Sequence, residues 1–153
     1  MREKRLVLNG EMLRIPNLAS LCAKPPPEES SPASQGQIYC IINSANGMRY
    51  IGQTTCYKLV AGKLVARGYE ARFEKHLSNA FSENRETRNG CGKLYDAIRK
   101  YGRAVFSVSL LETCPCSELN AREKHWIKAL KTRGKLGYNL TSGGQRPKKG
   151  RRR

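Results

Sequence analysis

The clearest pattern of apolar and polar positions predicts a β-hairpin in the first half of the chain. Residues 38–42 are rich in β-branched and aromatic side chains, residues 43–47 are turn formers that include an Asn-Gly pair, and residues 48–51 resume the strand pattern. Runs of this kind joined by a glycine-containing turn are typical of hairpins. We therefore expect two antiparallel strands here.

Each of these strands carries one tyrosine. Tyr39 shares a face with Ile41, and Tyr50 shares a face with Met48, because successive side chains of a strand point to opposite sides. Whether the two phenols meet depends on the register of the hairpin, which the pattern leaves open.

A helix is predicted from Tyr69, where apolar residues begin to recur at intervals of three and four. Arg72 lies beside this stripe and His76 lies on the same side, one turn on; an arginine here suits a solvated surface as well as a functional site. Before the helix, residues 53–68 are expected to form a loop with a short strand pair over 58–66. The apolar stripe consists of Tyr69, Phe73, Leu77, Ala80 and Phe81.

A second helix and a third strand follow. Residues 94–101 have helical spacing, Gly102 is a suitable stop signal, and residues 106–112 alternate as a strand. The predicted buried side of the helix consists of Leu94, Ala97, Ile98 and Tyr101.

The last predicted helix has a carboxylate in its apolar stripe. Ser117 is the candidate N-cap, and Glu123 points toward the apolar side. A lone buried carboxylate is costly unless a cation or a metal ion meets it, so an internal ion pair and a metal ligand both stay open. The stripe consists of Leu119, Glu123, Trp126, Ile127 and Leu130.

Length and composition favour one folded domain with two flanking segments. Residues 1–35 are predicted to form an N-terminal extension with a Pro/Ser-rich linker, residues 36–142 the domain, and residues 143–153 a basic disordered tail. Near the end of the domain, Asn139 is expected to point inward as a hydrogen-bonding brace.

The charge indicates a polyanionic partner. The chain has 29 Lys and Arg against 12 Asp and Glu, a formal net charge of +17, and residues 36–142 alone carry 18 basic and 8 acidic side chains. Nucleic acid is the first expectation, and an anionic membrane surface is the alternative.

Other sequence features narrow the class of protein. No apolar run approaches the roughly 18 residues of a membrane span, and no secretory leader is evident, so we expect an intracellular protein, nuclear in a eukaryotic or viral host and cytoplasmic otherwise. The six cysteines are scattered, which favours reduced thiols. Zinc at Cys114-Pro-Cys116 is an alternative that the spacing disfavours.

Five positions in order then combine into one specific pattern, which resembles the GIY-YIG endonuclease family and covers nearly all of the predicted domain. Glutamine stands where the first half-motif has glycine, a change expected to alter only a strand end. Some homing members also have a histidine before the second helix; here that region reads Asn89-Gly90-Cys91, so such help would come from His76 or be absent. The matching residues are Gln37-Ile38-Tyr39, Tyr50-Ile51-Gly52, Arg72, Glu123 and Asn139.

The resemblance implies a small α+β fold, a three-stranded antiparallel β-sheet flanked by helices, and a divalent-metal-dependent DNA endonuclease. Glu123 would bind Mg²⁺, for which Mn²⁺ would substitute, and Arg72 would stabilise charge on the phosphate. No small-molecule cofactor is expected, and the oligomeric state stays open.

By the same resemblance, Tyr39 would be the general base, Tyr50 would share its proton, and Asn139 would orient the site. Because a phenol with a pKa near 10 is a weak base at neutral pH, we expect Arg72 and other positive charges to favour the phenolate. His76 is a candidate assisting residue.

Two further matters stay open on the sequence alone. A non-catalytic basic nucleic-acid-binding module with the same fold is the rival, and within the enzymes a homing or mobile-element nuclease, a restriction enzyme and a structure-specific repair nuclease all remain. The residues of the tail that we expect to bind DNA are Lys148, Lys149, Arg151, Arg152 and Arg153.

Overall fold

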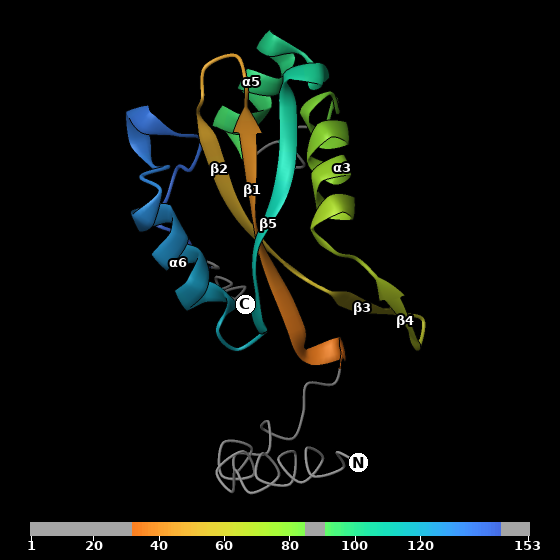
Figure 1. Ribbon diagram of the computed structural model, residues 1–153. Helices are drawn as coiled ribbons and strands as arrows, with labels where there is room; N and C mark the ends of the chain where they lie inside the picture. Colours follow the sequence, from red (N-terminus) through yellow and green to blue (C-terminus); the bar gives the residue numbers. More distant parts are fainter. Residues whose placement is uncertain (1–31, 85–90, 145–153) are drawn as a thin grey trace, which may run out of the picture. The chain divides into compact units, whose positions relative to one another are not determined.

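The computed structural model describes residues 32–84 and 91–144 (Figure 1). The predicted N-terminal extension up to residue 31 and the tail residues that we expect to bind DNA lie outside this part. The proposed division into domain and flanking segments therefore stays a prediction. In the described part, no helix is long and apolar enough to cross a membrane.

The fold is built on a three-stranded antiparallel sheet, as predicted. Its strands are β1 (Gln35–Asn43), β2 (Arg49–Thr55) and β5 (Phe106–Pro115), in the order β2-β1-β5. The predicted hairpin is β1 and β2, and β1 is the central strand. Edge strand β2 carries the second tyrosine of the motif.

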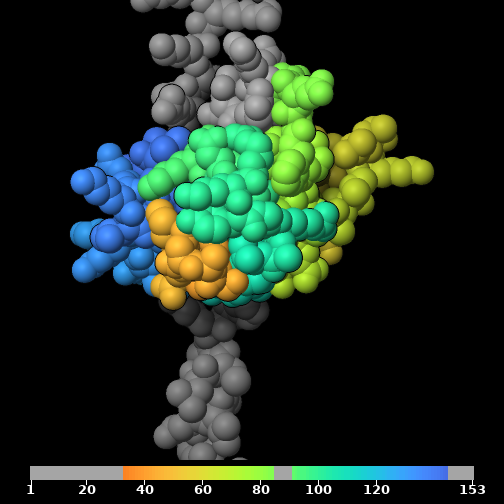
Figure 2. Space-filling view, turned by 90° about the horizontal axis from the view of Figure 1, so that it is seen from above, coloured from red at the N-terminus to blue at the C-terminus, as the bar shows by residue number. Residues whose placement is uncertain are grey.

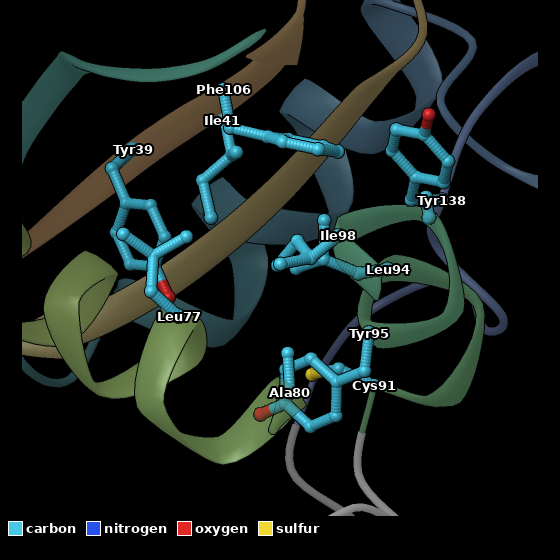
Figure 3. Packing of buried hydrophobic residues seen from close by; sticks show 11 residues of the cluster. Tyr39, Ile41, Leu77, Ala80, Cys91, Leu94, Tyr95, Ile98, Phe106 and Tyr138 are labelled. Carbon is cyan, nitrogen blue, oxygen red and sulfur yellow. The ribbon is translucent and has the colours of Figure 1, made fainter. Parts of the chain in front are cut away.

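Helices cover both faces of this sheet (Figure 1). Helices α3 (Tyr69–Ala80) and α5 (Gly92–Tyr101) pack on one face, and α6 (Leu119–Ala129) packs on the other. The alternation of β1 separates the two cores: Tyr39 and Ile41 point toward α3 and α5 (Figure 3), and Ile38 and Cys40 point toward α6.

The remaining elements are short. The strand pair expected before the first helix is present as β3 (Tyr57–Val60) and β4 (Lys63–Ala66). Three 3₁₀ turns complete the described chain: η1 (Pro32–Ser34), η2 (Arg103–Val105) and η3 (Gly134–Leu136).

Some details at the helix ends were predicted wrongly. Phe81 and Tyr101 were placed in buried stripes but are 59% and 37% exposed, because α3 ends one residue before Phe81 and α5 ends at Tyr101 itself. Tyr95 is buried in α5 instead. Ser117 is not the N-cap of the last helix, since Glu118 occupies that position. The stop at Gly102 is confirmed by its φ of 82°.

Candidate active site

The register of the hairpin places both motif tyrosines on one face of the sheet. Tyr39 pairs with Gly52 and Tyr50 pairs with Ile41, so the two phenols are diagonal neighbours. Both rings contact the imidazole of His76 on α3, with ring centroids 6.1 Å and 5.5 Å away. The sequence left open whether the two phenols lie near each other, and the pairing of the strands shows that they do.

His76 links two phenols in a buried chain of hydrogen bonds. Its Nε2 lies 2.8 Å from Tyr39 Oη, and its Nδ1 lies 3.1 Å from Tyr95 Oη. Burial, with a contribution from Arg72, lowers the pKa of His76 from 6.5 to about 3. The ring is therefore neutral at physiological pH, and one of its nitrogens can accept a hydrogen bond from a phenol.

This depressed pKa predicts acid sensitivity of the fold. As the pH falls below 6.5 the unfolded chain protonates His76 while the folded chain does not, so stability is lost down to about pH 3. Urea unfolding between about pH 7 and about pH 4 should show the wild type losing up to about 1.4 kcal/mol per pH unit more than His76→Gln. Equal slopes for the two proteins would contradict a neutral buried His76.

Arg72 lies one helical turn before His76 and is half-buried beside Tyr39. Burial raises the pKa of Tyr39 above its ordinary value, and Arg72 offsets only part of this rise. The pKa of Tyr50 is also raised, by burial and then by Cys91. Arg72 thus favours the phenolate of Tyr39, as expected, but desolvation outweighs the guanidinium and the net pKa is raised.

Gly52 makes the room that the Tyr39 hydroxyl occupies. A β-carbon at position 52 would lie 2.4 Å from Tyr39 Oη and 2.5 Å from Cζ, far inside contact distance. Because Tyr39 is only 1% exposed, its ring cannot move aside into solvent. The glycine of the second half-motif therefore allows the phenol to reach the edge strand.

Glu123 approaches the same strand from the opposite face of the sheet. It projects from α6, it is 9% exposed, and its Oε2 accepts hydrogen bonds from Gln53 Nε2 at 3.0 Å and from the Gly144 backbone N–H at 2.6 Å. Neighbouring residues 52 and 53 of β2 are thus contacted by Tyr39 on one face and by Glu123 on the other. The carboxylate is near enough to contribute to the raised pKa of Tyr39 and of Tyr50.

The partners of Glu123 differ from the ion pair considered as its alternative. No ion pair to Glu123 is found within residues 32–84 and 91–144; amide donors satisfy Oε2 instead. That part of the chain also contains no cluster of three or more metal-ligating side chains. A single carboxylate suits Mg²⁺, which keeps several waters and commonly takes one or two protein ligands together with phosphate oxygens.

Asn139 braces the edge strand, in agreement with the role expected for it. Its amide bonds the backbone of Ile51 twice, Nδ2 donating to the carbonyl at 2.8 Å and Oδ1 accepting from the N–H at 2.9 Å, and Thr132 Oγ1 donates to Oδ1 at 2.7 Å. Within the described residues no strand pairs with β2 on that side, where a single bridge joins Arg49 to Gly137, so the Asn139 side chain takes the place of a strand at Ile51. Asn139 thereby fixes the residue between Tyr50 and Gly52.

Three contacts at the site were missed or underrated from the sequence. Gln37 does more than alter a strand end: its Oε1 accepts a hydrogen bond from the Tyr69 backbone N–H at 2.9 Å, at the first turn of α3. Tyr95 holds His76, and the Cys91 thiol lies 3.3 Å from Tyr50 Oη. The buried stripe predicted for α5 was the sequence signal that could have identified Tyr95. No local feature of the sequence marks Gln37 as a cap of α3.

Comparison with known proteins supports a nuclease fold. No protein-family model and no curated protein matches the chain. Among solved structures, an alanine mutant of the catalytic domain of intron endonuclease I-TevI is 26% identical, with a TM-score of 0.54, over 72% of this chain and 97% of that one. A second structure of the catalytic domain of homing endonuclease I-TevI is 27% identical, with a TM-score of 0.50, over 69% of this chain and 98% of that one. In its fold and in these structural neighbours, the chain is confirmed to resemble the GIY-YIG endonucleases.

Proposed function

We propose that this protein is a divalent-metal-dependent endonuclease that hydrolyses phosphodiester bonds of DNA. The observation that carries the proposal is the gathering of two phenols, a guanidinium and a carboxylate around residues 52 and 53 of β2. These groups come from β1, β2, α3 and α6. Packing alone gives no reason for an arginine and a glutamate to converge on buried tyrosines, because each charge costs desolvation energy there.

Arg72 is the group that would bind the scissile phosphate. Its guanidinium offers parallel N–H donors that match two phosphate oxygens, and it stays charged at any accessible pH. Burial lowers the pKa of Arg72, while Tyr39 raises it, with a net rise. The arginine would therefore meet the phosphate as a cation and neutralise charge that develops on its oxygens.

Tyr39 and His76 would together accept the proton of the attacking water. In this scheme the water gives a proton to Tyr39 Oη while the phenol proton passes to His76 Nε2 along the 2.8 Å hydrogen bond. The hydroxide attacks phosphorus, the bond between phosphorus and the 3′ oxygen breaks, and the 3′ oxygen takes a proton from solvent. His76 then returns the proton that it accepted to solvent. The tautomer with hydrogen on Nδ1, donated to Tyr95, keeps Nε2 available.

The substrate itself would favour this transfer. Burial is the larger cause of the low pKa of His76 and Arg72 is the smaller one. A phosphate bound next to Arg72 would counter the contribution of Arg72, and the transfer requires that the pKa of His76 be higher in the complex with DNA. Tyr50, whose ring also lies against His76, would orient the imidazole and share the proton. Asn139 would act only by holding β2.

Glu123 would hold the divalent cation, through the carboxylate oxygen that its described hydrogen bonds leave free. When bound, Mg²⁺ or Mn²⁺ supplies Lewis-acid stabilisation of phosphate and leaving-group oxygens.

A hollow near Glu123, mainly apolar in surface but with four basic side chains among its lining residues, is a candidate path for DNA. It has a volume of about 450 Å³ and is lined by Lys124, Lys128, Lys131 and Arg133 together with apolar side chains. Residues 142–144 connect it to Glu123, since Gly144 bonds the carboxylate and Ser142 lines the hollow. We propose that the DNA strand continues across this hollow and that the basic side chains bind its phosphates.

Within the nucleases we propose the homing or mobile-element type, because both structural neighbours are homing or intron endonuclease domains. Restriction and structure-specific repair are its alternatives. The rival outside the enzymes is a basic binding module without catalysis. We further propose an intracellular location, where DNA is found.

Incubation of the full chain with supercoiled plasmid tests the function directly. We expect nicked or linear product with Mg²⁺ or Mn²⁺ and none with a chelator. Binding without cleavage under every metal condition would leave the binding module as the function. Mapping the ends on plasmid, branched and single-stranded DNA distinguishes a sequence-specific homing cut from a structure-specific one.

A further inference from the structure

A β-hairpin stands out from the domain between β2 and α3, two elements that carry candidate site residues. Strands β3 and β4 are joined by Ala61 and Gly62, whose φ angles are 48° and 78°. Two-residue turns with positive φ at both positions are of type I′, and their twist matches that of the strands. Figure 2 shows this segment projecting from the body of the domain.

All eight strand residues of this hairpin are exposed, although most are apolar. Leu59 and Leu64 are 65% and 55% exposed, and their pairing places them on one face. Lys58 and Lys63 lie on the other face, each opposite a valine. The ribbon therefore has an apolar face and a lysine-bearing face. Strand β3 lies near η1, and all the strand side chains of the ribbon stay exposed.

The charge of this region selects a polyanion as the partner. Residues 31–69 contain four basic side chains and no Asp or Glu. None of the ion pairs found in the described ranges includes a hairpin residue. A second copy of the same ribbon would bring like charges together, whereas a nucleic acid would be attracted.

The dimensions of the ribbon fit a DNA groove. Four residues per strand at about 3.3 Å each give a reach of about 13 Å. The major groove of B-DNA is about 12 Å wide and about 8.5 Å deep, and it admits a two-stranded β-ribbon. The minor groove of undistorted B-DNA is only about 6 Å wide, and proteins that insert into it bend or kink the duplex.

The base of the ribbon is tied to the site. The Cys56 carbonyl accepts hydrogen bonds from the backbone N–H groups of Arg67 and Gly68 at 2.7 Å and 3.4 Å, and α3 with Arg72 begins at the next residue. The other end of the hairpin continues directly from β2. A phosphate held by Arg72 would therefore have the ribbon beside it.

We propose that the β3-β4 hairpin enters the major groove of duplex DNA next to the scissile phosphate. Leu59 and Leu64 contact base edges, including thymine methyl groups, and Lys58 and Lys63 contact phosphates. This inference rests on the proposed nuclease function and deepens it, because it assigns duplex DNA as the substrate and places a grip on one flank of the cut.

Binding measurements on the full chain carrying Glu123→Gln, which keeps the DNA intact, test the inference. Lys58→Gln/Lys63→Gln should reduce the slope of log Kd against log salt by about two, at about 0.9 for each phosphate contact. Leu59→Ser/Leu64→Ser should weaken duplex binding about tenfold while single-strand binding is unchanged. Lys75→Gln/Lys100→Gln removes the same charge from exposed positions of α3 and α5 and should leave the slope within about half a unit.

Methylation of guanine N7, an atom of the major groove, gives a direct readout. We expect the Glu123→Gln protein to protect N7 on one flank of its site and the hairpin variants to lose that protection. Absent N7 protection, or hairpin variants that bind like the control, would overturn the inference even where the wild type cuts DNA. A wild type that protects N7 but never cuts would overturn the nuclease function and leave the ribbon contact standing.

Light scattering tests the remaining possibility, in which a second copy of the protein binds the apolar face of the hairpin. A monomer, or a dimer that both hairpin variants preserve, agrees with the DNA contact. A dimer that Leu59→Ser/Leu64→Ser dissociates would show that the apolar face binds a second copy, and the inference would be wrong.

Discussion

Glu123→Gln is expected to lower the rate of DNA cleavage by about a thousandfold or more while leaving the fold intact. Glutamine keeps one carbonyl oxygen, which can accept the hydrogen bonds from Gln53 and the Gly144 backbone, so α6 should stay in place. The substitution removes the negative charge that would bind a divalent cation. A loss of several kcal/mol of transition-state stabilisation corresponds to about a factor of ten for each 1.4 kcal/mol.

Three measurements make this result decisive. Plasmid nicking gives the rate, titration with Mn²⁺ gives the affinity for the ion, and binding to a short duplex shows that the DNA surface is preserved. Glu118→Gln, an exposed change just before the same helix, removes the same charge and should cleave like the wild type. Nicking by Glu123→Gln at near wild-type rate would show that Glu123 only bonds Gln53 and Gly144, and the proposed chemistry would fall.

The sequence predicted the elements of the fold better than their contacts. The β-branched and aromatic runs on either side of the turn in 38–51 and the helical spacing from Tyr69 are local signals, and both elements form where expected. The contact of the two phenols depends on the register, in which Tyr39 pairs with Gly52, and register is a property of the paired strands. Side-chain spacing within one strand could not supply it.

The predictions about the site that were wrong or incomplete have two physical causes. One is electrostatics in a buried environment, and the other is contact between residues far apart in the sequence. Charge counting led to a lowered pKa for Tyr39, but the phenol is 1% exposed, and the desolvation cost exceeds the effect of Arg72. Gln37 looked like a changed strand end because its partner, the Tyr69 backbone, lies 32 residues away. Both facts require the folded environment.

The arrangement of the site follows from the use of an edge strand. In the part of the chain that the structure describes, no strand pairs with β2 on one side, so side chains from both faces of the sheet can reach the same pair of residues at this edge. Tyr39 reaches Gly52 from the α3 face and Glu123 reaches Gln53 from the α6 face, while Asn139 occupies the free backbone of Ile51. A central strand is paired on both sides, so it would offer no free edge at which these side chains could meet. In the proposed reaction, residues on opposite faces of the sheet would act on one phosphate at this edge.

Tyr39→Phe is expected to lower the cleavage rate by about a hundredfold or more with only a modest loss of stability. The substitution deletes one oxygen, retains the ring in the core and leaves His76 Nε2 without its phenol, which costs about 1 kcal/mol of unfolding free energy. If the phenol and His76 carry the proton together, the variant should also lose the pH dependence that this pair gives the rate, measured by nicking across the pH range at saturating DNA.

Tyr138→Phe is the matched control, because Tyr138 is buried in the same core and its hydroxyl accepts hydrogen bonds from Asn43 and Asn46, away from His76. It should lose similar stability and keep its cleavage rate. Equal loss of rate in both variants would mean that the Tyr39 hydroxyl acts through packing, and that another group takes the proton from water.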